Sequence, residues 1–210
     1  IMALSKIDIA NMLTGVTPVA NGGTGLASGT TDQFLKFTGS TTVASAAVPS
    51  GLTGAQTFRP TGNTTVTTGA DTLITNWEEI DEPAGQGVIG SSVSHSSGTF
   101  TIAATGIWLV TTGAKFQMTT TNRYFGLNIQ YTTDAWSSTQ SATNPSGSAY
   151  RDSGTYYQMG TFNSEIFDVQ DTTNYQLRFQ GSCEQTNGAA VLGSSASTQS
   201  WCSFIRLGDT

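Results

Sequence analysis

Between residues 72 and 207 the sequence reads as short strand-like segments separated by turns rich in Gly, Asn, Asp, Ser and Thr, with no helical pattern among them. Regularly spaced strands without helices are typical of a two-sheet antiparallel sandwich or jelly roll. The sequence therefore predicts an all-β fold for this part of the chain. The expected strands are residues 72–77, 99–103, 107–118, 124–131, 156–169, 174–181 and 200–207.

Two of these strands alternate as expected for a sheet with one buried and one solvated face. Their apolar faces carry Phe125, Leu127, Ile129 and Tyr131 in the first, and Tyr175, Leu177 and Phe179 in the second. Three other strands, 107–118, 156–169 and 200–207, carry bulky apolar residues on both faces. A second apolar face needs cover, and we expect a homotrimer, although the N-terminal segment could fold back over it instead. The residues expected at the trimer interface are Trp108, Val110, Phe116, Met159, Phe167 and Phe204.

The N-terminal part of the chain differs in composition. Residues 1–62 are poor in bulky apolar side chains and rich in Gly, Thr, Ala and Ser, so they are expected to be an attachment or shaft segment. A short helix is expected over residues 1–13, then an extended glycine-rich stretch, a short strand at 34–37 and a linker over 43–63. Residues 63–210 are expected to form the head.

Charge excludes several classes of partner. Only 10% of the 210 residues are charged and the formal net charge is −6, whereas an ordinary domain has about 25% charged residues. The eight basic residues are scattered, and nucleic-acid binding needs them clustered. No apolar run approaches the ~20 residues of a membrane span. Neither nucleic acid nor membrane insertion is expected, and a hydroxyl- and amide-rich surface suits an extracellular particle.

Two cysteines, Cys183 and Cys202, are too few for a disulfide scaffold. Two free thiols are expected, with a late bridge between the last two strands as the alternative.

The stretch 15–26, which contains Gly22-Gly23-Thr24-Gly25, resembles the Gly-Gly-Thr-Gly segment of phage tail-fibre and structural proteins. In those proteins a Gly-Gln-Val-Leu-like strand follows. Here Asp32 replaces the usual Gly and Phe34 the usual Val before Leu35. This resemblance implies a virion protein, assembled in the host bacterial cytoplasm. It would attach to other virion proteins through an N-terminal segment that includes Leu4, Ile7, Ile9, Met12 and Leu13.

Residues 72–207 are similar to the jelly roll of tumour necrosis factor and the complement globular head. The resemblance lies in residues 97–110, where Gly98, Phe100 and Gly106 match a pattern of two strands joined by a tight turn, and in the closing strand 203–207. Trp108 or Ile107 stands near the family's usual tyrosine, and the closing strand lacks its glycine. The resemblance implies a trimer with the sheet of the last strand at the three-fold axis.

A loop between expected strands, residues 134–157, combines aromatic and polar side chains. Rings on a polar loop give rigid contact area for sugars, and loops on a sandwich commonly carry recognition. The alternative is that these rings only cover a sheet edge or a neighbouring copy. The expected receptor or glycan contacts are Trp136, Asn144, Tyr150, Arg151, Tyr156 and Tyr157.

No catalytic constellation is expected. The acids Glu78, Glu79, Asp81 and Glu82 are interpreted as a solvated loop, with a calcium loop or a glycosidase site as weaker alternatives. His95 is interpreted as part of a hairpin loop, and a triad would have to use this single histidine. The sequence therefore predicts a trimeric virion fibre with an adhesive head, no cofactor, no metal and no enzymatic activity. A purely structural capsid decoration or head fibre is the alternative, and a polysaccharide-cleaving spike is a weaker one.

Overall fold

The computed structural model describes residues 30–40, 42–47, 51–67, 71–80, 87–90, 92–118, 120, 122–143, 146–149, 157–185 and 188–210. The chain divides into two compact units, Ile1–Gly51 and Leu52–Thr210. The head was expected to begin at residue 63, but it begins at Leu52, because Ala55–Pro60 is already a strand of its sheet.

In the first unit, β1 (Gln33–Phe37) and β2 (Val43–Ala47) form an antiparallel hairpin. The short strand expected at 34–37 is present, and its partner β2 comes from the stretch expected to be a linker. Every residue of β1 is exposed. The helix expected over residues 1–13 and the glycine-rich stretch 15–26 lie outside the described residues.

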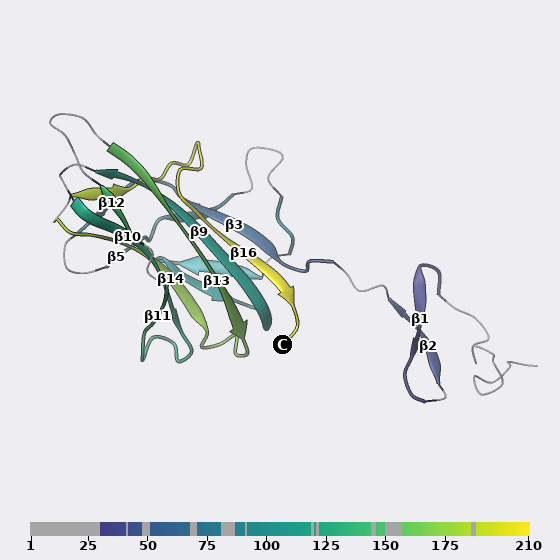
Figure 1. Cartoon of the computed structure of the whole chain (residues 1–210). Helices are drawn as coiled ribbons and strands as arrows, with labels where there is room; N and C mark the ends of the chain where they lie inside the picture. The colour runs from purple at the N-terminus through teal and green to yellow at the C-terminus, as the bar shows by residue number, and fades with distance from the viewer. Residues whose placement is uncertain are drawn as a thin grey trace, which may run out of the picture. The chain divides into compact units, whose positions relative to one another are not determined.

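The second unit is a sandwich of two antiparallel sheets, and its described residues contain no helix (Figure 1). The expected all-β, two-sheet architecture is confirmed. One sheet, called here the β9 sheet, is built around the 13-residue strand β9 (Gly106–Met118). Its other strands are β3 (Ala55–Pro60), β4 (Thr64–Val66), β6 (Trp77–Glu79), β13 (Tyr157–Val169), β15 (Ala189–Val191) and β16 (Trp201–Gly208).

In the β9 sheet, β13 pairs with β9 along its whole length on one side. On the other side, β16 and β15 pair with β9 one after the other. β16 also pairs with β3, so the last strand of the chain lies in the interior of the sheet (Figure 1).

The second sheet, called the β14 sheet, places β14 (Gln176–Cys183) next to β10 (Asn122–Thr132) and β8 (Thr99–Ile102). The remaining strands are β5 (Thr72–Leu73), β7 (Val93–Ser96), β11 (Gln140–Thr143) and β12 (Ser146–Ala149). β11 and β12 pair with the edge of β10 that faces away from β14, and β7 pairs with β8.

The core between the sheets is a cluster of aromatic rings around Phe100 of β8, which is fully buried. The centroid of its ring lies 5.2 Å from those of Phe58 and Phe204, 5.3 Å from that of Phe179 and 5.5 Å from that of Trp77. Because these four rings come from both sheets, Phe100 joins the two layers. Burying one such side chain contributes about 1.5–3 kcal/mol.

A tight turn at Ser97 and Gly98 connects β7 to β8, with positive φ at both residues (48° and 82°). A two-residue hairpin turn that needs positive φ at its central residues favours glycine there. A Cβ at Gly98 would also lie 2.5 Å from the carbonyl oxygen of Ile74. The turn is thus shorter than predicted, because His95 lies on strand β7 and not in the loop.

Six of the seven expected strands correspond to single strands of the structure. The exception, residues 72–77, is split into β5 and the start of β6. The strands that were not predicted are short or small in side chain: β2, β3, β4, β7, β11, β12 and β15.

Candidate functional site

The outward surface of the β9 sheet carries two apolar rows that cross three strands. In the first row Phe162 of β13 and Trp201 of β16 flank Gly113 of β9. The ring centroids of Phe162 and Trp201 are 6.1 Å apart. A Cβ at Gly113 would lie 2.8 Å from the indole nitrogen of Trp201, so the glycine lets this ring lie close over the sheet.

The second row consists of Ile166, Leu109 and Ile205, in register across β13, β9 and β16. Hydroxyl side chains separate the two rows, with Thr111 of β9 opposite both Ser164 and Ser203. These rows leave large apolar surfaces in water, because Phe162 is 60% exposed and Ile166 59% exposed. We call this surface the assembly face and define it as Leu109, Phe162, Ile166, Trp201, Ile205 and Leu207.

The outward surface of the β14 sheet is polar. One of its rows joins Gln130, Arg178 and Thr99, and the next joins Thr132, Gln176 and Thr101. Side chains of this kind are satisfied by water or, as for the buried Thr132 hydroxyl, by hydrogen bonds within the chain, and they need no partner protein. The two outward surfaces of the sandwich therefore differ in chemistry, and only the assembly face has the character of an association site.

The assembly face is not the one that the sequence predicted. Trp108, Val110, Phe116, Phe167 and Phe204 are all buried, at 5% exposure or less, in the core between the two sheets. They cannot contact another copy, so the prediction chose the wrong face of each strand. Met159 alone of the six is exposed, at 38%.

The alternation contained the signal that separates the two faces. The side of β9 that includes Trp108 holds apolar residues at almost every alternate position as far as Met118, whereas the opposite side holds only Ile107 and Leu109 before Thr111. The more continuously apolar side is the one that fits a monomer's core. This signal is limited to β9, because on β16 the outward side, with Trp201, Ile205 and Leu207, is as apolar as the side with Cys202 and Phe204.

The loop after β10 holds Trp136 in a fixed position. The Asp134 carboxylate accepts hydrogen bonds from the hydroxyl of Thr132 (2.6 Å) and from the amide and hydroxyl of Ser138 (2.9 and 2.7 Å). These bonds lower the pKa of Asp134 to about 2, with Thr132 as the largest cause. The Trp136 amide donates to the Thr132 hydroxyl at 3.0 Å. Loop geometry is thus set by one short capping network.

Trp136 packs on the polar sheet face instead of projecting freely. The guanidinium carbon of Arg178 lies 3.8 Å from the centre of its ring, which is cation–π geometry. The Nε of Arg178 donates to the hydroxyl of Thr99 at 2.9 Å. This position agrees with a structural role for Trp136 and leaves part of its surface exposed.

The remaining predicted contact residues are not brought together by the described part of the structure. Asn144, Tyr150, Arg151 and Tyr156 lie outside the described residues, and Tyr157 is described only as the first residue of β13. The predicted attachment residues Leu4, Ile7, Ile9, Met12 and Leu13 also lie outside them.

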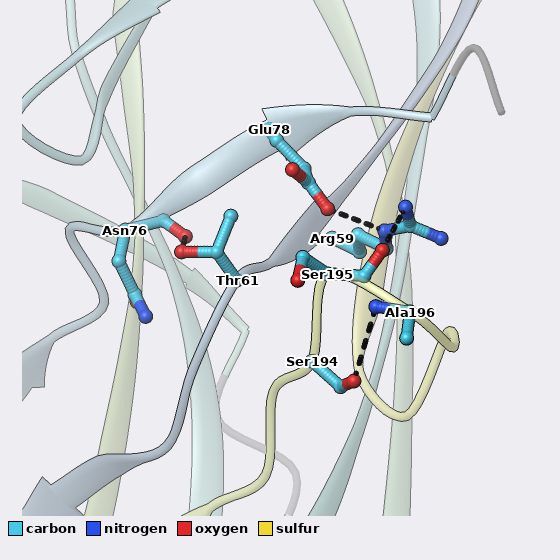
Figure 2. A network of polar contacts seen from close by, with 7 residues as sticks. All are labelled: Arg59, Thr61, Asn76, Glu78, Ser194, Ser195 and Ala196. Carbon is cyan, nitrogen blue, oxygen red and sulfur yellow. Dashed lines mark hydrogen bonds and ion pairs between the residues drawn. The ribbon is translucent and has the colours of Figure 1, made fainter.

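A buried ion pair fastens the loop before β16 to the edge of the β9 sheet (Figure 2). Arg59 of β3 donates from Nε to a carboxylate oxygen of Glu78 on β6 at 2.6 Å, and its Nη2 donates to the Ser195 carbonyl. The side chain of Arg59 is 7% exposed and that of Glu78 is 32% exposed. In the same view the Thr61 hydroxyl donates to the Asn76 carbonyl.

Of the acidic and histidine residues singled out in the sequence, Glu78, Glu79 and His95 have structural partners, whereas Asp81 and Glu82 lie outside the described residues. Glu78 and Glu79 lie on β6 and not in a loop, and Glu79 accepts a hydrogen bond from Gln56 at 2.8 Å. His95 contacts the rings of Phe58 and Phe100, and burial lowers its pKa despite the opposing charge of Glu79. Among the described residues, no group of three or more His, Cys, Asp or Glu side chains is placed to hold a metal ion.

Cys183 and Cys202 are both free and buried. Burial raises the pKa of each thiol, most strongly for Cys202. The expected pair of free thiols is confirmed. In the part of the chain that the structure describes, no helix is long and apolar enough to cross a membrane.

Solved structures share this fold. Murine APRIL at pH 5.0 is 12% identical, with a TM-score of 0.52, over 73% of this chain and 98% of that chain. Eiger TNF from S. frugiperda is also 12% identical, with a TM-score of 0.50, over 77% of this chain and 96% of that chain. No protein-family model and no curated protein matches the sequence. The head is therefore a TNF-like jelly roll, as the sequence resemblance implied, and this likeness concerns the fold.

Proposed function

We propose that this chain is a structural protein of a bacteriophage particle, a homotrimeric fibre or appendage whose head attaches to the host cell surface. The observation that carries the assembly part is the contrast between the apolar assembly face and the polar outward surface of the β14 sheet. The glycine-rich segment at residues 15–26 supports the virion part through its resemblance to tail-fibre proteins. Residues 1–51 then connect the head to other virion proteins.

The assembly face has enough free surface to hold copies together. Phe162 exposes 60% of its surface, about 120 Å² if a phenylalanine offers roughly 200 Å². At about 25 cal/mol per Å², covering it contributes about 3 kcal/mol per protomer. Ile166 and Leu207, at 59% and 50% exposure, add comparable amounts.

Adhesion to host glycan is the proposed task of the head. Its support is the rigid sandwich that carries capped polar loops, together with the lack of clustered positive charge that nucleic-acid binding needs. We further propose that the chain is not an enzyme, and the support is that Glu78, Glu79 and His95 pair with core and strand residues instead.

Light scattering on the purified full chain tests the assembly. We expect a mass near three times 21.9 kDa that is stable on dilution. The double variant Phe162→Lys, Ile166→Lys should be monomeric and folded. The matched control Gln130→Lys, Gln176→Lys on the β14 sheet should keep the native mass. A wild type that stays monomeric at all concentrations would refute the trimer.

Flow cytometry of the labelled chain on a panel of bacterial strains tests adhesion. Binding to at least one strain supports the adhesive head, whereas a stable trimer that binds none of its own virion's host cells would favour the alternative of a purely structural capsid decoration. The predicted loop is tested by changing Trp136, Tyr150, Tyr156 and Tyr157 to Ala. Unchanged cell binding by that folded variant would exclude the loop as the contact.

A further inference from the structure

An open groove of about 470 Å³ lies at one edge of the sandwich, where β13 of the β9 sheet meets the end of β10 and β11 of the β14 sheet. Aromatic rings form its floor. Tyr131 and Tyr175 are stacked with ring centroids 6.0 Å apart, and Phe167 lies 5.5 Å from Tyr131. This volume and mixed lining are in the usual range for a small-molecule site.

The Tyr175 side chain has a polar group available to a ligand. The residue is 6% exposed, yet it lines the groove, and no described residue forms a hydrogen bond with its hydroxyl. Burial, with added effects from Tyr131 and Asp168, raises the pKa of this hydroxyl above its ordinary value. The hydroxyl therefore keeps its proton at neutral pH and can donate a hydrogen bond to a ligand in the groove.

Charge in the groove has one sign. Glu165 and Asp168 line it, and its lining contains no Lys, Arg or His. A ligand that offers donors to the carboxylates and an acceptor to Tyr175 fits this lining, and negative charge on the ligand is unfavourable. A sugar hydroxyl is both donor and acceptor, whereas an ammonium group has no acceptor to offer Tyr175.

Two capped turns hold one end of the groove in place. Asp171 accepts hydrogen bonds from the amides of Thr173 and Asn174, and the Ala135 amide donates to the Asn174 carbonyl at 3.2 Å. The turn before Tyr175 is thus tied to the loop that carries Thr133, another lining residue. A preformed site loses less entropy on binding a ligand.

We propose that this groove binds a neutral pyranose unit of the host surface glycan, a proposal that rests on the adhesive function above. One face of the sugar ring packs on the ring of Tyr131. Its hydroxyls donate to Glu165 and Asp168 and accept from Tyr175. Uronic and sialic acids are rejected by the two carboxylates.

The test uses saturation-transfer NMR and calorimetry on the assembled full chain, because Ile166 belongs to both the groove and the assembly face. The probes are the methyl glycosides of glucose, galactose, mannose and N-acetylglucosamine, with methyl glucuronide as the acidic counterpart. We expect at least one neutral glycoside to bind at least tenfold more tightly than the glucuronide. Asp168→Asn should reduce that discrimination.

Tyr175→Phe removes one oxygen and keeps the ring. The variant should therefore fold normally and bind the neutral sugar at least tenfold more weakly than the wild type does. Tyr124→Phe, on the outward surface of β10 and 44% exposed, is the matched control and should bind like the wild type. The proposal is overturned if no neutral glycoside binds at millimolar concentration, or if Tyr175→Phe binds as well as Tyr124→Phe.

Cell binding measured in parallel separates the two proposals. If Tyr175→Phe adheres to cells like the wild type, the groove assignment fails and the adhesive function stands. If the wild type binds a neutral glycoside in the groove but adheres to no cells, the groove stands and the adhesive function fails.

Discussion

Replacing Glu78 by Ala removes the counter-charge of a guanidinium that the fold has taken out of water. Arg59 is 7% exposed and donates to Glu78 and to the Ser195 carbonyl, whereas Glu78 is 32% exposed. The two partners therefore differ in what is left behind when the other is lost. Loss of Glu78 leaves a buried positive charge, and loss of Arg59 leaves a carboxylate that water reaches.

The magnitudes follow from this difference. Breaking a fully buried pair costs about 3–5 kcal/mol, and partial exposure of Glu78 reduces this to about 2 kcal/mol for Glu78→Ala. Arg59→Met keeps most of the stem packing and loses one hydrogen bond to Ser195, at about 1 kcal/mol. In the double variant no buried charge remains, so it should be as stable as Arg59→Met alone.

Urea unfolding followed by tryptophan fluorescence, at one fixed protein concentration, measures these free energies. A domain of this size loses about 2–4 °C in Tm per kcal/mol, so Glu78→Ala should lower Tm by about 4–8 °C. The control is Asp209→Ala, which breaks the Arg206–Asp209 pair whose carboxylate is 90% exposed. It should change stability by no more than about 0.5 kcal/mol.

The reasoning is refuted if Arg59→Met destabilises more than Glu78→Ala. It is equally refuted if the double variant loses the sum of the two single effects, because the cost of Glu78→Ala would then come from something other than the uncompensated charge of Arg59.

The pKa of Asp134 is lowered from 3.8 to about 2, so its hydrogen bonds support the loop above pH 4 and are lost as the pH falls through 2. In an NMR titration the Ser138 amide signal should therefore shift near pH 2 and not near pH 4, and Asp134→Asn should abolish that shift. Gly98→Ala should lower the free energy of unfolding by at least about 1–2 kcal/mol because of the positive φ at this residue, and the contact with the Ile74 carbonyl adds to this loss. A variant as stable in urea as the wild type would contradict the turn geometry. Cys183 and Cys202 should resist a thiol reagent at pH 8 in the native protein and both react in urea; rapid native labelling would contradict their burial.

The fold class could be predicted because the long strands carry a clear period. β10 and β14 place large apolar residues at alternate positions, and β9, β13 and β16 are long apolar-rich segments bounded by turn residues, a combination that few folds other than a sandwich fit. β3 was missed because its segment contains Pro60 and polar side chains, and it is stabilised by pairing with β16 far along the chain. Short strands such as β15 likewise owe their conformation to neighbours and not to their own residues.

The candidate sites were less predictable, because sheet geometry decides them. Both faces of β13 and β16 are apolar, and only the position of the β14 sheet shows that Phe204 lies inside and Ile205 outside. The groove joins Tyr131, Phe167 and Tyr175 from three separate parts of the sequence. From the sequence, Tyr131 and Tyr175 were interpreted as core residues and Phe167 as a trimer contact, and their convergence at one open edge depends on the topology.

The position of β16 also affects how the chain can be made. Strand β3 pairs with β16, as in the hydrogen bond between Thr57 and Ser203, which are 146 residues apart, and β16 fills the place between β3 and β9. Until β16 has been synthesised, the edges of β3 and β9 that it joins lack this partner. The β9 sheet therefore cannot close while the preceding segments are being made, and contacts of such long range form slowly. A truncated chain without β16 would leave both edges unpaired and prone to aggregation.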